Sequence, residues 1–380
     1  MDFSLTKEQE FVQKMVRSFA QAEIAPIAGD LDKEHRYPRE IVDKMGKLGL
    51  MGIPFPKEYE GAGGDSIAYA IAVEELSKAY AATGTMCAAQ NSLCNWPIYH
   101  FGTEEQKEKY LPDLCSGRKV GGFALTEPNA GSDSALQQTR AEDKGDHWLV
   151  NGSKVFITNG SVGDVFVVFA MTDKSKKTRG ISAFIVENTF EGFSTGKIED
   201  KMGIRASNTA ELVFRNMVVP KENIIGRPGE GFKIAMTTLD GGRIGVAAQA
   251  VGIAQGALDV TLDYMKARKQ FGRRLADMDP LRFVVAELAT EIEAARLLVY
   301  CAADLKDRGR PFGHISAMAK YYSSEVAMKT TTKCVQLHGG YGYTADYPVE
   351  RMMRDAKITE IYEGTTEVQK MVVAGAVIGK

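Results

Sequence analysis

Residues 361–367 carry the sequence IYEGTTE, which places the carboxylate of Glu363 between an aromatic ring and a glycine. Gly364 allows the chain to turn sharply and a ligand to approach the backbone closely. A carboxylate partly shielded by Tyr362 is a candidate general base. The same residues also fit a helix C-terminus followed by a turn, with a solvated Glu363. The stretch alone does not choose between these two interpretations.

Length and composition indicate a globular protein with more than one domain. The chain has 380 residues, of which 44% are hydrophobic and 25% are charged, and this length suggests two or three domains. A formal net charge of -2 gives no reason to expect a nucleic acid partner. Residues 1–8 lack the layout of a signal peptide, and the longest apolar runs fall well short of the ~20 residues that span a bilayer. We therefore expect a cytoplasmic protein that does not bind membranes.

The cysteines and histidines do not form a recognisable metal site. The five residues of each type are scattered along the chain, and neither the two-residue spacing of a cysteine knuckle nor a His-Glu-x-x-His motif occurs. We expect buried free thiols in a reducing compartment and no bound metal.

The pattern of apolar residues predicts helices, then strands, then helices. A capping box at Thr6 and Gln9 begins a first helix, and Pro26 is expected to end it. Residues 120–219 contain short runs rich in β-branched and aromatic residues without intervening helices, whereas residues 281–302 show an apolar stripe in steps of three and four. We predict an α+β fold. It has an N-terminal helical domain (1–119), a middle antiparallel β-domain (120–228) and a C-terminal four-helix bundle (229–380).

Common nucleotide-binding signatures are absent from the sequence. The glycine pairs at 61 and 63, 229 and 231, and 340 and 342 lack the third glycine of the dinucleotide fingerprint, and no Gly-Lys pair is followed by Ser or Thr. These gaps argue against a Rossmann dehydrogenase and against a P-loop nucleotidase.

Two segments in the β-region suit a flat heteroaromatic ligand. Residues 123–134 read FALTEPNAGSDS and offer hydroxyls and backbone N–H groups in a turn-rich loop, and residues 154–160 read KVFITNG. Either segment alone also fits an ordinary β-turn.

Together with residues 361–367, these segments resemble the acyl-CoA dehydrogenase family, most closely its bacterial short-chain (butyryl-CoA) members. The resemblance covers essentially the whole chain in the family's α–β–α order. The matching motifs are LTEP (125–128), FITNG (156–160), KMGIR (201–205), RKQFG (268–272), QLHGGYGY (336–343) and IYEGT (361–365).

The resemblance implies that FAD binds between the β-domain and the bundle. Phe123, Leu125 and Thr126 would line one side of the isoalloxazine ring, and Phe156 and Thr158 would cover the other. Arg268, Phe271 and residues 336–340 would hold the FAD of a neighbouring subunit. The cofactor residues implied are Phe123, Leu125, Thr126, Ser132, Phe156, Thr158, Arg268, Phe271, Gln336, Leu337, His338, Gly339, Gly340, Thr365 and Glu367.

The resemblance also implies a reaction and partners. Glu363 would remove the α-proton of an acyl-CoA while the β-hydrogen leaves as hydride to flavin N5, and the reverse reduction is equally compatible. Some relatives carry the base at the position of Gly242, which cannot serve. Electrons would pass to electron-transferring flavoprotein, and the chain would form a homotetramer, a dimer of dimers. Substrate contacts are implied for Ser132, Asp240, Arg243, Tyr362 and Gly364.

Two alternatives remain beside this interpretation. A decarboxylating dehydrogenase of a dicarboxylyl-CoA would need a cationic group near the acyl chain, and residues 90–97 contain none. A flavin-binding scaffold without catalysis would not need to retain Glu363 together with the flavin-type segments.

Asp279 departs from the family pattern, because many members have glutamine at this position. An acid followed by Pro280 replaces an amide that can bond FAD, so Asp279 is not assigned to the cofactor site. We expect the Asp279→Gln variant to hold FAD at least as tightly as the wild type. Flavin retention after dilution measures this, and weaker retention would contradict it.

Overall fold

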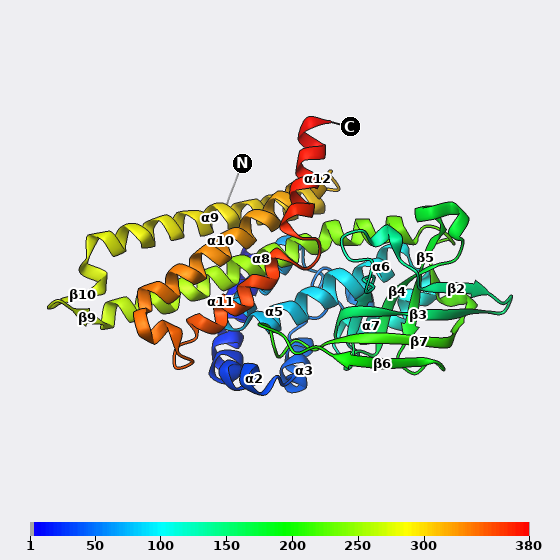
Figure 1. Ribbon diagram of the computed structural model, residues 1–380, viewed down its shortest axis with the longest axis horizontal. Coiled ribbons are helices and arrows are strands. Elements are labelled where there is room, and N and C mark those ends of the chain that lie inside the picture. Colours follow the sequence, from blue (N-terminus) through cyan, green and yellow to red (C-terminus); the bar gives the residue numbers. More distant parts are fainter. Residues whose placement is uncertain (1–3, 380) are drawn as a thin grey trace.

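The computed structural model describes residues 4–379, and its elements follow the predicted order (Figure 1). The first helix, α1 (Lys7–Phe19), begins with the predicted capping box, in which Thr6 and Gln9 bond each other's backbone N–H groups. Pro26 does not end this helix. The chain passes through a π-turn (Ala20–Ile24) and a 3-10 turn (Ala25–Ile27) instead, and Pro26 lies where its missing N–H costs nothing. The next helices are α2 (Ala28–Glu34) and α3 (Arg39–Lys47).

Residues 66–115 form a group of helical segments. The segments are α4 (Ser66–Ala79), α5 (Ala81–Ala88), a π-helix (Ala89–Asn95), α6 (Trp96–Phe101) and α7 (Glu104–Cys115). Tyr80 adopts an extended conformation and separates α4 from α5. Nearly all side chains from Ala68 to Asn95 are buried, which explains why the sequence there shows no polar face.

The middle of the chain forms one twisted sheet that is largely antiparallel. Its strands are β1 (Gly121–Ala124), β2 (Arg140–Asp143), β3 (His147–Thr158), β4 (Val165–Met171), β5 (Ile181–Glu187), β6 (Phe193–Ile198), β7 (Thr209–Pro220) and β8 (Ile224–Ile225). The order is β6-β7-β3-β2-β4-β5-β8, and β1 pairs with β4. The expected antiparallel pairing needs one correction, since β1 and β2 both run parallel to β4. Parallel neighbours need a long connection, and residues 125–164 supply it.

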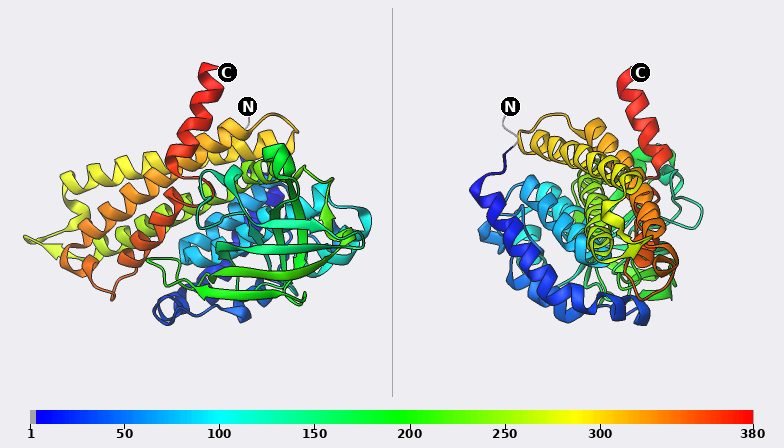
Figure 2. Two further views of the ribbon diagram at one scale, coloured as in Figure 1. Left: turned by 45° about the vertical axis from the view of Figure 1, so that its right-hand side comes forward. Right: turned by 90° about the vertical axis from the view of Figure 1, so that its left-hand side faces the viewer.

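The last third forms the helical bundle. The long helices α8 (Gly231–Ala267), α9 (Asp279–Asp307) and α10 (Gly313–His338) lie side by side with the shorter α11 (Val349–Lys357), whereas α12 (Thr366–Ile378) projects away (Figures 1 and 2). A small hairpin of β9 (Lys269–Gln270) and β10 (Arg273–Arg274) joins α8 to α9 at the end of the bundle far from the sheet (Figure 1).

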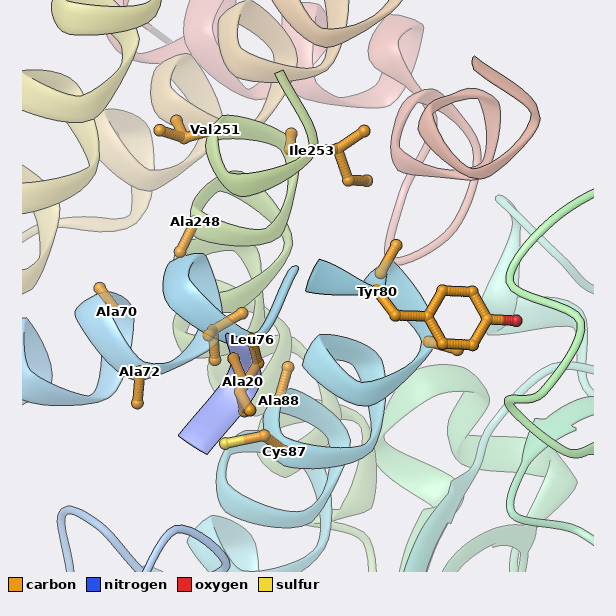
Figure 3. Close-up of a cluster of buried hydrophobic side chains, with 14 of the residues drawn as sticks. Ala20, Ala70, Ala72, Leu76, Tyr80, Cys87, Ala88, Ala248, Val251 and Ile253 are labelled. Carbon is orange, nitrogen blue, oxygen red and sulfur yellow. The ribbon is translucent and has the colours of Figure 1, made fainter. Parts of the chain in front are cut away.

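Helix α8 is the element around which the two helical regions pack. By length and composition it could cross a membrane, but 83% of its most apolar window is buried inside the protein. Figure 3 shows part of this packing, with Ala248, Val251 and Ile253 of α8, Leu76 of α4 and Cys87 of α5, and all belong to one apolar core. Four cysteines are buried free thiols as expected, but Cys301 is exposed on the outer face of α9.

Candidate active site

Glu363 lies in a tight turn between a 3-10 turn (Ile358–Glu360) and α12. Its φ is +53°, a left-handed conformation that costs energy for a residue with a side chain. Gly364 follows with φ of +91°, and a Cβ atom there would lie 2.6 Å from Nε2 of Gln369. The turn therefore favours glycine at 364, and a side chain there would displace the amide of Gln369.

Two side-chain donors hold this turn in place. Lys320 of α10 donates from Nζ to the carbonyl oxygen of Gly364 at 2.8 Å, and its side chain is fully buried. Gln369 of α12 donates from Nε2 to the same oxygen at 2.8 Å and to the carbonyl oxygen of Glu363 at 3.1 Å. Neither Lys320 nor Gln369 was among the site residues predicted from the sequence. The available signal for Lys320 was a lysine within the apolar stripe of residues 315–335.

The carboxylate of Glu363 lies against the backbone of α8. Its Oε2 atom is buried and has no hydrogen-bond partner among the residues that the structure describes. A Cβ atom at Gly242 would lie 2.2 Å from that oxygen and 3.1 Å from Cδ2 of Leu93. The absence of a side chain at position 242 therefore makes room for the carboxylate of Glu363.

Burial dominates the electrostatics of this carboxylate. It raises the pKa of Glu363 to about 7, although the positive charges of Lys320 and Arg243 act in the opposite direction. The Lys320 ammonium is itself affected, because burial lowers its pKa to about 8 while the charge of Glu363 partly opposes that shift. A carboxylate with this pKa is suited to accept a proton near neutral pH.

We expect the rate of proton abstraction to depend on pH through Glu363. Only the ionised carboxylate accepts a proton, and its pKa is raised to about 7. The second-order rate constant for flavin reduction at low substrate should therefore rise with pH and level off above pH 7. Anaerobic stopped-flow absorbance between pH 5.5 and 9 measures this, and a rate constant that is flat across this range would contradict it.

Arg243 and Asp240, which the resemblance placed at the substrate, form a pair on α8. Nη1 of Arg243 donates to Oδ1 of Asp240 at 2.6 Å, whereas its Nε is buried without a partner among the described residues. Burial lowers the pKa of the Arg243 guanidinium and raises that of the Asp240 carboxyl. The unsatisfied Nε leaves one donor free for a further acceptor close to Glu363.

Tyr362, beside the base, is tied to the core. Its hydroxyl donates to Oε1 of Gln249 on α8, and Gln249 in turn donates to Thr85 of α5 at 2.8 Å and to the carbonyl oxygen of Ala81 at 3.1 Å. This chain of hydrogen bonds fixes the residue that precedes Glu363 to both helical regions.

The two flavin-type segments lie side by side on the sheet. The N–H of Val155 donates to the carbonyl oxygen of Thr126 at 2.9 Å. Buried Lys154 donates to the carbonyl oxygen of Leu125 at 3.0 Å and to Glu127 at 2.7 Å, which fixes the turn after β1. The predicted flavin residues on this surface differ in exposure: Leu125 is buried, and Phe123, Thr126 and Thr158 are half-buried. Ser132 is exposed. Phe156 is 66% exposed, and its backbone has a φ of +58°.

The remaining predicted cofactor residues form a second group at the other end of the bundle. The ring of His338 stacks on Tyr264 with centroids 4.3 Å apart, and Arg268 lies over the ring of Tyr341 at 5.4 Å. Figure 1 shows this end, marked by β9 and β10, far from the sheet. One protomer therefore does not bring Arg268, Phe271 and Gln336–Gly340 to the first group. Thr365 caps α12 by accepting from the N–H of Val368, and Glu367 is exposed.

Both groups fit parts of a dinucleotide with a flat aromatic ring system. Each group presents an exposed apolar ring that a planar ligand can cover, Phe156 in the first and Phe271 in the second. The side chain of Phe271 is 95% exposed. Gly339 and Gly340 have no atom within 4 Å of a Cβ built on them, so a ligand can approach their backbone closely. Nε2 of His338 is buried and has no partner within the described part of the chain.

Comparison with known proteins assigns the entire architecture. Three family models match: the N-terminal domain of acyl-CoA dehydrogenase over residues 6–118, its middle domain over residues 122–217 and its C-terminal domain over residues 229–378.

Individual relatives are similar over their full lengths. A short-chain specific acyl-CoA dehydrogenase of Clostridium acetobutylicum is 61% identical, over 99% of this chain and 100% of the relative. The solved butyryl-CoA dehydrogenase of Megasphaera elsdenii is 51% identical with a TM-score of 0.98, covering 100% of both chains. A chain from a structure concerning the electron transferring flavoprotein of Acidaminococcus fermentans and flavin-based electron bifurcation is 56% identical with a TM-score of 0.99, again covering 100% of both chains.

Proposed function

The chain belongs to the acyl-CoA dehydrogenase family, and we propose that it dehydrogenates a short-chain acyl-CoA to the trans-2-enoyl-CoA or catalyses the reverse reduction. The family depends on FAD, which accepts the β-hydrogen as hydride when it is bound. Short-chain relatives, including the butyryl-CoA dehydrogenase, support the substrate class. The reaction balances because the α-proton passes to the base and the two electrons of the β-C–H bond leave with the hydride.

The observation that carries this proposal is the state of the Glu363 carboxylate. Its Oε2 is buried and has no partner within residues 4–379, and its pKa is raised to about 7. A structural carboxylate at this depth would be paired with a cation or with several donors. An unpaired one is instead available for a proton on a ligand. In the proposed reaction Glu363 removes the α-proton, and its own backbone N–H helps to hold the thioester oxygen on which negative charge develops.

The other proposed contacts follow from the two groups described above. Ser132, Asp240, Arg243, Tyr362 and Gly364 would contact the acyl-CoA. The FAD of the same protomer would be contacted by residues of the sheet region and by two residues after the base. These are Phe123, Leu125, Thr126, Ser132, Phe156, Thr158, Thr365 and Glu367.

We further propose a homotetramer, a dimer of dimers, because the β9–β10 hairpin lies far from the sheet of its own protomer (Figure 1). This end of the bundle carries Arg268, Phe271 and residues 336–340. In such an assembly these residues would complete the FAD site of a neighbour. We also propose domain limits of 1–119, 120–228 and 229–380, and a soluble protein of the cytoplasm.

Electron-transferring flavoprotein is the proposed electron partner. A chain 56% identical to this one occurs in a structure concerning such a flavoprotein and electron bifurcation. The purified protein, reduced without oxygen, should pass its electrons on when the oxidised partner flavoprotein is added together with a dye that accepts electrons from it. Loss of the dye's colour measures the transfer, and omission of the partner flavoprotein is the control.

The proposed function is tested optically. The purified protein should show a yellow flavin spectrum, and addition of butyryl-CoA without oxygen should bleach it. The reverse reaction is tested by adding crotonyl-CoA to the chemically reduced protein, which should reoxidise the flavin. If butyryl-CoA does not reduce the flavin and crotonyl-CoA does not reoxidise it, both the substrate class and the role of Glu363 are wrong.

A further inference from the structure

Two glycines on one face of α8 are covered by the tips of two different side chains. Gly242 and Gly245 are three residues apart and so lie on neighbouring turns of the same face. A Cβ atom at Gly242 would lie 2.2 Å from Oε2 of Glu363, and a Cβ atom at Gly245 would lie 2.2 Å from the hydroxyl oxygen of Tyr69. The base and a tyrosine hydroxyl therefore follow one another along the helix.

Tyr69 is held firmly in this position. It belongs to α4 and is 2% exposed, and its hydroxyl donates to the carbonyl oxygen of Ala88 at 3.4 Å. Ser92 donates to the same oxygen at 2.7 Å, and the Cβ of Ala88 would lie 3.2 Å from a Cβ at Gly245. A buried phenol with a partner at its tip and backbone on its flank has little freedom to swing aside.

Exposure along α8 gives the direction in which an acyl chain would lie. The side chain of Asp240 is half-exposed and that of Arg243 is nearly buried, whereas Gly245 and Tyr69 are fully enclosed. The polar CoA portion of a substrate must remain toward the exposed end, and the apolar tail is favoured at the buried end. The tail therefore extends past Glu363 toward Tyr69.

The spacing of the two oxygens limits the length of that tail. Cβ positions three residues apart on a helix are about 5–6 Å from each other. Because each oxygen lies 2.2 Å from its Cβ position, the Glu363 carboxylate and the Tyr69 hydroxyl are separated by about 10 Å at most. Non-bonded contacts of about 3.5 Å at each end take up most of this length. At about 1.5 Å for a carbon–carbon bond, the remainder holds no more than about two or three carbons beyond the α-carbon. A butyryl chain has two such carbons.

We propose that Tyr69 is the specificity-determining residue of this enzyme: its buried hydroxyl closes the acyl end of the site beside Gly245 and excludes chains longer than the short ones. This inference rests on the proposed function, because it assumes that an acyl-CoA binds with its α-carbon at Glu363. It adds a residue that sets the chain-length limit.

The test compares acyl-CoA affinities for Tyr69 variants in the FAD-loaded protein with Glu363→Gln, in which substrate binds without being consumed. Butyryl-, hexanoyl- and octanoyl-CoA are titrated, and the change in the flavin absorption spectrum gives each Kd. Tyr69→Ala should lower the ratio of the hexanoyl to the butyryl Kd by about tenfold or more, the effect expected for added space for methylene groups. Tyr69→Phe, which removes one oxygen atom, should lower the ratio by a smaller factor.

Tyr110→Ala is the matched control. Tyr110 is equally buried, but it lies on α7, where its hydroxyl bonds Glu187, away from α8. Its removal should leave the ratio of the two Kd values unchanged. Equal ratios in the wild-type, Tyr69→Phe and Tyr69→Ala backgrounds would overturn the proposal, and Tyr69→Phe decides alone if Tyr69→Ala does not fold. Failure of the proposed function shows separately, as a lack of bleaching when Glu363 is intact.

Discussion

Glu363→Gln should bind acyl-CoA and FAD with affinities close to those of the wild type but reduce its flavin about 10²–10⁴-fold more slowly. Glutamine has the same shape and fills the same space against Gly242, but it cannot accept the α-proton. The rise in rate with pH that Glu363 produces should disappear with it. Anaerobic stopped-flow reduction by butyryl-CoA measures the rate, and spectral titration measures the binding.

Glu360→Gln provides the control from the same loop. Glu360 lies three residues before the base, is 20% exposed and forms an ion pair with Lys357 at 2.6 Å, so its carboxylate is already paired. This variant should reduce its flavin at the wild-type rate with the wild-type pH dependence. If Glu363→Gln kept a wild-type rate, or if both variants lost activity equally, the assignment of Glu363 as the base would be wrong.

The fold was predictable where local sequence signals agree with long-range packing. The capping boxes at Thr6 and Thr103 begin helices as their sequences indicate, and the stripe of residues 281–302 lies on the inner side of α9. The parallel pairing of β1 and β2 with β4 was not predictable in this way. Strand direction depends on the path of the connection through residues 125–164, which no local pattern encodes.

The site was predictable only in part, for a similar reason. Glu363 and Gly364 could be singled out because residues 361–365 match a motif of the family that the whole chain resembles. The contact of Lys320 with the turn is long-range in sequence, since Lys320 is 44 residues from the carbonyl that it bonds. No local pattern marks such a contact, and none marked Gln369. A lysine inside an apolar helical stripe can equally extend its ammonium to solvent, so its sequence position did not reveal a buried hydrogen bond.

Lys320→Met should reduce flavin about 10²-fold more slowly and move the rising limb of the pH profile to higher pH. The rate falls because the turn of Glu363 loses one of its two side-chain anchors, and a displacement of about 1 Å at a reacting group can cost this factor. The limb moves up because the Lys320 charge opposes the rise that burial causes in the pKa of Glu363. Without that charge the carboxyl keeps its proton to a higher pH.

Lys329→Met separates this role from a general effect on α10. Lys329 is on the same helix but at the surface, where it pairs with Glu291, so its loss should change neither the rate nor the pH profile. FAD content and thermal unfolding are measured for both variants. A Lys320→Met protein that holds FAD and reduces it slowly at every pH, with its limb still near pH 7, would show that Lys320 only supports the fold. If the rising part of the pH profile moves to higher pH and the rate partly recovers there, the Lys320 ammonium acts on Glu363 itself. Loss of packing alone would leave the proton affinity of the base unchanged.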